Sequence, residues 1–218
     1  MRRVLKCIVI FIFPAILQAG NFNLGMDIGY RSGLSLQMDG TVSNISRNFP
    51  FKLRLAGAYT SLDPGNPAAA RRIFINNATN GTPEETGWMW DVRFDVLYQV
   101  NWFSLKDAWF FAGPRYSWFT GRFDFVGGNE DFDIYCDQWG LGAGLQTNYA
   151  ISKKLNLVLS AGLDYFITEY LHGHDTTYHA NGEIYNGREN YNFNDADEAI
   201  NQPTFVPKIS IGFSYLIY

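Results

Sequence analysis

A strict alternation of apolar and polar residues recurs along the chain, and it constrains the fold more than any other feature. Between Trp90 and Trp102 the even positions are all apolar or aromatic, and the odd positions are mostly charged or amide residues. A period of two is typical of a β-strand with one apolar and one polar face. The same period recurs over 139–149, 155–168 and 208–217. The sequence therefore predicts an all-β fold.

Lipid, rather than a second sheet, is the expected neighbour of the apolar faces. Those faces are bulky and bracketed by aromatics, and the opposite faces carry charges, glycines and amides. Trp139 and Tyr149 lie ten residues apart on one face. At ~3.3 Å per residue and ~45° tilt this is ~23 Å along the membrane normal, close to the height of a lipid-facing band between aromatic girdles. The leucines expected to face lipid are Leu141, Leu145, Leu157 and Leu159.

Short and long connections alternate between the predicted strands, as they do in barrels with short periplasmic turns and long extracellular loops. The predicted strands are two within 22–42, then 49–61, 88–102, 109–120, 138–150, 155–169 and 204–217. The long segments are 62–87, 121–137 and 170–203. We therefore expect an eight-stranded antiparallel up-and-down transmembrane β-barrel, because only a closed barrel leaves no unpaired strand edge in lipid.

The number of strands depends on residues 22–42. A tight turn at 31–33 would divide this segment into two strands. The apolar parity nevertheless runs unbroken from Leu24 to Met38, so one long strand is an alternative. That alternative would leave seven strands, whereas bacterial single-chain barrels have an even number.

Residues 1–19 are predicted to be a cleaved signal peptide. A cationic start over 1–6 is followed by an apolar run from Cys7 to Leu17, and small residues follow at Ala19 and Gly20. This order is that of a secretory signal, and the run is shorter than the ~20 residues of a spanning helix, which argues against a retained anchor. A lipoprotein is excluded because the cysteine precedes the apolar stretch instead of following it. Residues 20–218 then form the barrel domain.

The charge of the mature chain argues against a nucleic-acid partner. Cleavage would remove three of the 17 basic residues and none of the 21 acidic ones, which leaves a net charge of −7. Nucleic-acid binding would require clustered positive charge. Cys136 would be the one remaining cysteine, so no internal disulfide is expected.

The chain resembles the small bacterial outer-membrane β-barrels typified by OmpX and the membrane domain of OmpA. The resemblance rests on the signal peptide, the strand and loop rhythm, and the C-terminal strand 204–217 followed by Tyr218. It implies a location in the bacterial outer membrane, lipid as a partner, and recognition of the last strand by the barrel insertion machinery. One departure is that Tyr218 does not share parity with Phe213 and Tyr215. Members of the family act as anchors, adhesins, surface antigens or occasionally enzymes, so the fold does not determine the function.

Charged residues recur on the faces predicted to point into the barrel. An eight-stranded barrel is just wide enough for side chains to fill it, and unpaired buried charges are costly. We therefore expect a polar network that plugs the lumen, with a narrow ion path as the alternative. The predicted lumen residues are Asp27, Arg31, Lys52, Arg54, Asp91, Arg93, Asp95, Arg115, Asp164 and Lys208.

Metal sites and cofactors are not expected. His172, His174 and His179 form the one compact cluster of zinc- or copper-capable groups, but they lie in a segment predicted to be an exposed loop. Nothing in the sequence fixes a first and second ligand shell there. The acidic clusters at 130–133 and 195–198 lack the spacing of a calcium loop, and solvated loop faces are the better interpretation.

The expected function is a non-enzymatic structural or surface-interaction role, exerted through the long loops on an extracellular partner. The first alternative is a small ion or solute channel. The second is a lipid-modifying enzyme, because His172 follows predicted strand seven closely, although no serine is fixed beside it.

Overall fold

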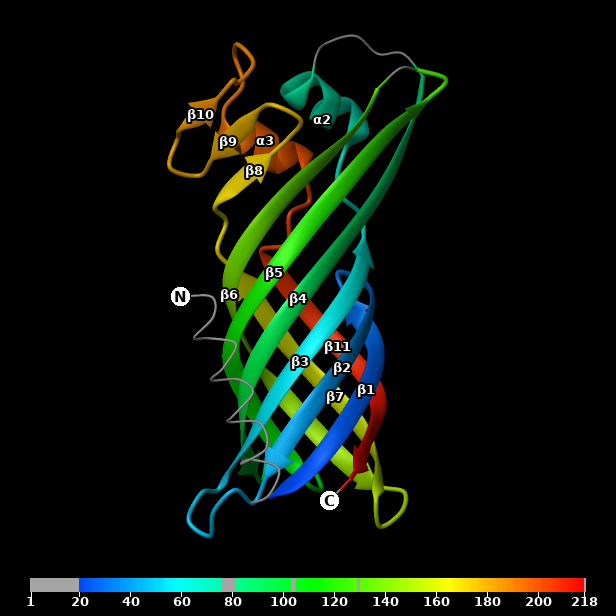
Figure 1. Cartoon of the computed structure of the whole chain (residues 1–218), viewed down its shortest axis with the longest axis vertical. Coiled ribbons are helices and arrows are strands. Elements are labelled where there is room, and N and C mark those ends of the chain that lie inside the picture. The colour runs from blue at the N-terminus through cyan, green and yellow to red at the C-terminus, as the bar shows by residue number, and fades with distance from the viewer. Residues whose placement is uncertain (1–19, 76–80, 103–104, 129, 218) are drawn as a thin grey trace, which may run out of the picture.

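The protein forms a tall barrel with its helices gathered at one end (Figure 1). The computed structural model describes residues 20–75, 81–102, 105–128 and 130–217. The predicted signal peptide, 1–19, and the terminal Tyr218 lie outside the described residues.

Within the described residues, eight strands close into one antiparallel barrel. Each strand pairs with its neighbour in sequence, and β11 pairs with both β1 and β7, so the barrel has no free edge. The predicted fold class is therefore confirmed. The barrel strands are β1 (Asn21–Arg31), β2 (Gly33–Ser43), β3 (Phe51–Leu62), β4 (Thr82–Val100), β5 (Ala108–Val126), β6 (Asp131–Ala150), β7 (Leu155–Phe166) and β11 (Phe205–Leu216).

The segment predicted to hold two strands does hold two. Ser32 alone separates β1 from β2, and its φ of 56° lies in the left-handed region that a sharp reversal needs. Tyr30 pairs with Leu34 across this turn, and both side chains are exposed. Across this turn the even-numbered residues of both strands lie on the same face of the sheet. The apolar parity therefore continues unbroken through two antiparallel strands.

The outer face of the barrel is apolar. Leu141 and Ile209 expose 67% and 70% of their surface, and the girdle residues Trp139 and Tyr149 are exposed on the same face of β6. A continuous apolar surface of this kind suits lipid and not water. The four leucines predicted to face lipid lie on this outward face.

No helix among the described residues has the length and apolar character needed to cross a membrane.

A cation on the lipid-facing surface should destabilise the barrel. Leu145 lies midway along the membrane part of β6 and pairs with Phe110 and Ala161. Leu145→Arg is expected to cost ~2–4 kcal/mol of folding free energy in lipid vesicles, because arginine at the bilayer midplane loses its hydration. Leu145→Ala keeps the site apolar and should cost less. An unchanged free energy for the arginine variant would contradict the orientation.

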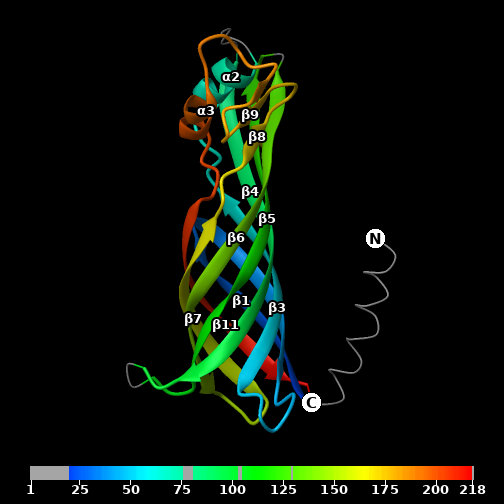
Figure 2. The same ribbon diagram turned by 90° about the vertical axis from the view of Figure 1, so that its left-hand side faces the viewer.

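The prediction that 121–137 is a long loop is wrong. β5 continues to Val126 and β6 begins at Asp131, so this segment is a strand hairpin, and β4 likewise begins at Thr82 rather than 88. β7 ends earlier than predicted, at Phe166. The three strands β4, β5 and β6 thus rise beyond the rest of the barrel (Figures 1 and 2). We call this part, residues 82–88, 119–126 and 131–137, the extension.

The other two predicted loops also contain secondary structure, and they fold onto the extension. Segment 62–87 contains α2 (Pro67–Phe74), and segment 170–203 contains β8 (Tyr170–His172), β9 (Thr177–His179), β10 (Ile184–Tyr185) and α3 (Phe193–Ala199). We call these five elements the cap. Both helices begin at asparagine caps: Asn66 accepts from the Ala69 amide at 3.0 Å, and Asn192 forms a capping box with Asp195.

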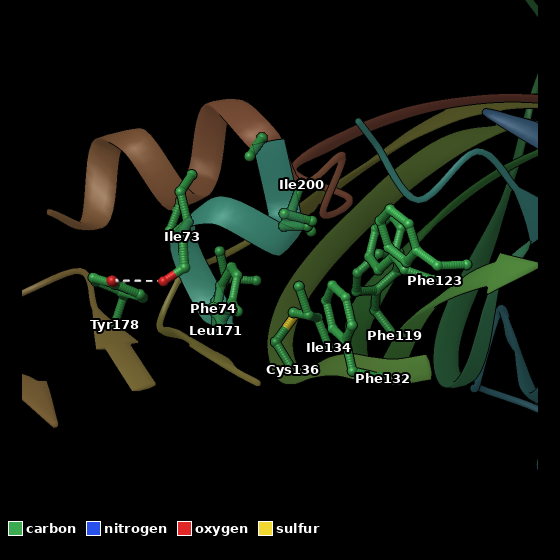
Figure 3. Packing of buried hydrophobic residues seen from close by; sticks show 14 residues of the cluster. Ile73, Phe74, Phe119, Phe123, Phe132, Ile134, Cys136, Leu171, Tyr178 and Ile200 are labelled. Carbon is green, nitrogen blue, oxygen red and sulfur yellow. Dashed lines mark hydrogen bonds between the residues drawn. The ribbon is translucent and has the colours of Figure 1, made fainter. Parts of the chain in front are cut away.

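An apolar core joins the cap to the extension (Figure 3). Phe74 of α2 packs edge-on against Tyr178 of β9, with ring centroids 5.4 Å apart. The Tyr178 hydroxyl donates to the Ile73 carbonyl oxygen at 3.1 Å, and burial raises the pKa of Tyr178, which keeps this donor protonated. The buried members of the core are Ala70, Ile73, Phe74, Phe119, Phe123, Phe125, Phe132, Ile134, Cys136, Leu171, Tyr178, Ala196, Ala199 and Ile200.

Candidate functional site in the barrel lumen

Four arginines and three aspartates form a connected ionic network inside the barrel. Each aspartate lies within ion-pair distance of at least two arginines. Asp91 accepts from Arg31 Nη1 at 2.7 Å and from Arg93 Nε at 2.9 Å. The members of the network are Arg31, Arg54, Arg93, Arg115, Asp91, Asp95 and Asp164.

Asp95 lies between two further arginines, Arg54 of β3 and Arg115 of β5. Arg54 donates to its Oδ2 atom through Nε at 3.0 Å and through Nη2 at 2.6 Å. Arg115 Nη2 lies 2.7 Å from its Oδ1 atom. With Asp91 and its partners, the network therefore connects side chains of β1, β3, β4 and β5.

Asp164 of β7 completes the network. Its two oxygens lie 3.0 Å from Arg115 Nε, 3.2 Å from Arg31 and 3.5 Å from Arg93. The carboxylate is fully buried, so these contacts are not screened by water. Arg31 reaches from β1 to acids of both β4 and β7, which places its guanidinium across the lumen.

The other three predicted lumen residues lie outside these ion pairs. Asp27 accepts a hydrogen bond from Gln37 Nε2 at 2.9 Å. The Lys52 ammonium lies 3.6 Å from the ring centroid of Trp109, and that of Lys208 lies 4.5 Å from the ring centroid of Phe111. The structure therefore brings seven of the ten predicted residues into one network. Whether they serve a function beyond structure stays a prediction.

The network lies between an apolar layer and a small cavity. On the cap side, buried Met89, Phe166 and Val206 pack together with Leu62 against them. The lumen therefore holds the ionic network and, between it and the cap, a layer of apolar side chains. On the short-turn side is a cavity of about 80 Å³, whose lining includes the charged residues Asp27, Lys52, Arg54 and Lys208.

Sequence reasoning missed the uncharged residues of the lumen. Gln146 accepts from Arg54 Nη1 at 2.7 Å, and Phe111 lies beneath two cations, with the Arg54 guanidinium 4.8 Å from its centroid. Gln146 had a detectable signal, because it shares the polar face of predicted strand 138–150. Phe111 had none, because an inward phenylalanine in a polar lumen breaks the alternation rule.

The three histidines lie on the cap rather than in an open loop. His172 ends β8, its Nδ1 is 2.6 Å from the Thr177 hydroxyl, and burial lowers its pKa. His179 ends β9, whereas His174 is exposed between the two strands. Among the described residues no group of three metal-capable side chains lies close enough to share an ion.

The acidic clusters are more structured than predicted. Glu130 forms an ion pair with Arg71 of α2 at 2.8 Å, and Asp131 forms one with Arg122 at 3.0 Å. Asp195 caps α3, and a side-chain amide donates to Asp197. The interpretation as plain solvated loop faces is therefore wrong for Glu130 and Asp195, which make contacts that order the cap.

Solved structures of other proteins show the same architecture. No protein-family model matches the sequence. No curated protein matches it either. Among solved structures, a major outer membrane protein from Thermus thermophilus aligns with a TM-score of 0.73 and 21% identity, over 91% of this chain and 100% of that one.

Two further solved structures align with lower TM-scores. Ail, the attachment invasion locus protein of Yersinia pestis, aligns at 0.42 with 9% identity, over 91% of this chain and 97% of its own. Neisserial surface protein A aligns at 0.38 with 12% identity, over 89% of this chain and 94% of its own. The alignment with the Thermus protein, at 21% identity, shows the fold alone. The chain has the fold of the small, eight-stranded bacterial outer-membrane β-barrels.

Proposed function

We propose that this protein is a non-enzymatic outer-membrane barrel that displays a folded cap on the cell exterior for contact with other molecules. The observation that carries the proposal is the apolar core shared by the cap and the extension. A lumen that served only as a path would not require 14 buried residues packed above its mouth, whereas a recognition surface requires a rigid support.

The orientation of the cap follows from the connections. In barrels of this type the short turns face the periplasm and the long connections face outside. The cap is formed from the two longest connections, and the ends of the described chain lie at the opposite, short-turn end (Figure 1). Outer-membrane lipid then contacts the apolar belt. β11 would be the strand that the insertion machinery recognises, as the sequence predicted.

A surface role is also favoured by the exposed side chains of the cap. Tyr185 on β10 exposes 71% of its surface and its neighbour Ile184 exposes 44%. β10 forms the outer edge of the cap sheet, which runs from β6 through β8 and β9. An exposed aromatic residue on a short edge strand suits contact with a protein partner.

Planar-bilayer recordings test the closed state of the lumen. The purified full-length barrel is expected to give no stable conductance, because the ionic and apolar layers both occlude it. A double variant, Met89→Ser with Phe166→Ser, removes the apolar layer only and should stay silent if the ionic layer suffices. A stable open conductance from the wild-type protein would contradict the proposal and favour the channel alternative.

A further inference from the structure

A group of aromatic side chains lies on the outward face of β5, β6 and β8, where the extension meets the membrane part of the barrel. The ring centroid of Tyr116 lies 4.9 Å from those of both Trp118 and Trp139. The ring of His172 lies 5.1 Å from that of Tyr135, which is 47% exposed. We call these rings the aromatic patch, whose members are Tyr116, Trp118, Tyr135, Trp139, Tyr170 and His172.

Two carboxylates lie beside these rings without a cationic partner. Asp137 of β6 pairs with Trp118 of β5 and accepts one hydrogen bond, from the Tyr116 hydroxyl at 3.2 Å. Glu169 directly precedes Tyr170. Burial, followed by the charges of Asp137 and Glu169, raises the pKa of Tyr170, so both acids lie close to its ring. Neither acid forms an ion pair with any of the described residues.

The positive groups near the patch do not compensate these acids. Arg122, on the outward face of β5, already forms ion pairs with Asp124 and Asp131. Burial lowers the pKa of His172, which favours its neutral form. An aromatic girdle at the membrane boundary accounts for the tryptophans of the patch, but it does not account for carboxylates left among the rings.

The part of the protein formed by the extension and the cap is strongly acidic. Segments 62–88, 119–137 and 167–203 hold 15 of the 21 acidic residues and four of the 17 basic ones. Their net charge of −11 attracts cationic molecules and repels anionic ones. The charge of the whole exterior therefore favours the same kind of partner as the two acids of the patch.

We propose that the aromatic patch is the docking site for a lysine or arginine side chain of a protein partner, received by the ring faces and by Asp137. The inference deepens the proposed function and rests on it, because the patch must face the cell exterior. Aromatic ring faces attract a cation placed within ~6 Å. Asp137 Oδ1 accepts no hydrogen bond from the described residues, so it can accept a charge-assisted one from the partner.

Binding of a fluorescent hexalysine peptide to the folded full-length protein in a maltoside detergent tests the site. Fluorescence anisotropy should show saturable binding of this peptide and none of a hexaglutamate peptide. Asp137→Asn should weaken binding about tenfold or more, because it removes the charged acceptor. Tyr135→Leu should weaken it about two- to fivefold through the loss of a cation–π contact, whereas Tyr135→Phe keeps the ring and the affinity.

A competing cation separates ring contacts from plain charge attraction. Tetramethylammonium chloride replaces sodium chloride at constant ionic strength. It should weaken peptide binding to the wild type, because a weakly hydrated organic cation competes for the ring faces and sodium does not. Equal affinity in the two salts would overturn the contribution of the rings and with it the proposal.

Glu198→Gln is the matched control, because it removes the same charge from an exposed residue of α3 and should leave the affinity nearly unchanged. Equal weakening by Glu198→Gln and Asp137→Asn would overturn the proposal, since net charge alone would then attract the peptide. No binding by the wild type, or unchanged affinity in Asp137→Asn or Tyr135→Leu, would do so as well. Displacement of the peptide by phosphatidylcholine added to the micelles would assign the patch to a lipid headgroup and overturn the protein partner. Each of these failures leaves the proposed function standing, because the bilayer recordings test that function separately.

Discussion

Asp164→Asn is expected to destabilise the barrel by ~3–5 kcal/mol, because the aspartate lies within ion-pair distance of three arginines. Its substitution removes an acid that these arginines share, so their buried charges are left with only Asp91 and Asp95 as partners. Asparagine has nearly the same volume, so the cost reports charge rather than a cavity. Urea unfolding in lipid vesicles measures it.

The matched control for this variant is Asp124→Asn. Asp124 forms an ion pair with Arg122, at 3.1 Å, on the exposed face of the extension. Exposed pairs are screened by water, and this variant should therefore change the unfolding free energy little. If the two variants proved equally mild, the lumen network would not be an important source of stability.

Phe74→Ala is expected to unfold the cap while the barrel persists. Phe74 is fully buried in the shared core, and truncating such a ring typically costs ~3–5 kcal/mol. The cap packs mainly on the extension and little on the membrane part of the barrel, so the loss should be local. Arg71 is buried on the same helix, so trypsin reaches it only when the cap opens. Cleavage after Arg71 should accelerate by ~100-fold or more, because it follows the population of the opened state.

Arg72→Ala is the control on the same helix. Arg72 is exposed, whereas Phe74 two residues later is buried, so removal of the Arg72 side chain leaves the core intact. Cleavage after Arg71 should then proceed at the wild-type rate, and the unfolding midpoint of the barrel should match in all three proteins. Loss of the barrel in Phe74→Ala would show that cap and barrel fold as one unit.

The membrane part of the barrel could be predicted from the sequence because one physical rule governs it. Each residue of the wall either faces lipid or faces the lumen, so a period of two marks both the strand and its orientation. Trp90 to Trp102 and Leu24 to Met38 follow this rule, and the structure confirms strands over 90–100 and on both sides of Ser32. The lumen charges could be predicted for the same reason, since their parity opposes that of the lipid-facing residues.

The extension could not be recognised because the apolar residues change from the outward face to the inward face where the strands leave the lipid. On β5, Arg115 faces the ionic lumen, and Phe119 and Phe123 follow on the same inward face. The outward-facing residues become charged there, as at Arg122 and Asp124. A search for apolar residues of constant parity therefore stops at residue 120. Apolar and polar residues still alternate in the extension. A search for strands whose apolar face changes side would have found the hairpin.

The cap lay beyond such reasoning because its order depends on contacts distant in sequence. Tyr178 hydrogen bonds to Ile73 and Arg71 pairs with Glu130, and no local pattern links these segments. Short helices and strands of two or three residues have little intrinsic stability, so their periodicity is too brief to detect.

The unbroken run of β4, β5 and β6 from lipid to cap has a mechanical consequence. β5 has 19 residues, against 11 in β1, and at ~3.3 Å per residue it spans ~60 Å along its length. In the proposed orientation β5 continues as one strand across the membrane surface, so the cap would stand at a fixed height and angle above the bilayer. A force applied to the cap would be transmitted along hydrogen-bonded strands directly into the membrane-embedded wall, so the cap would behave as a stiff lever rather than as a tethered loop.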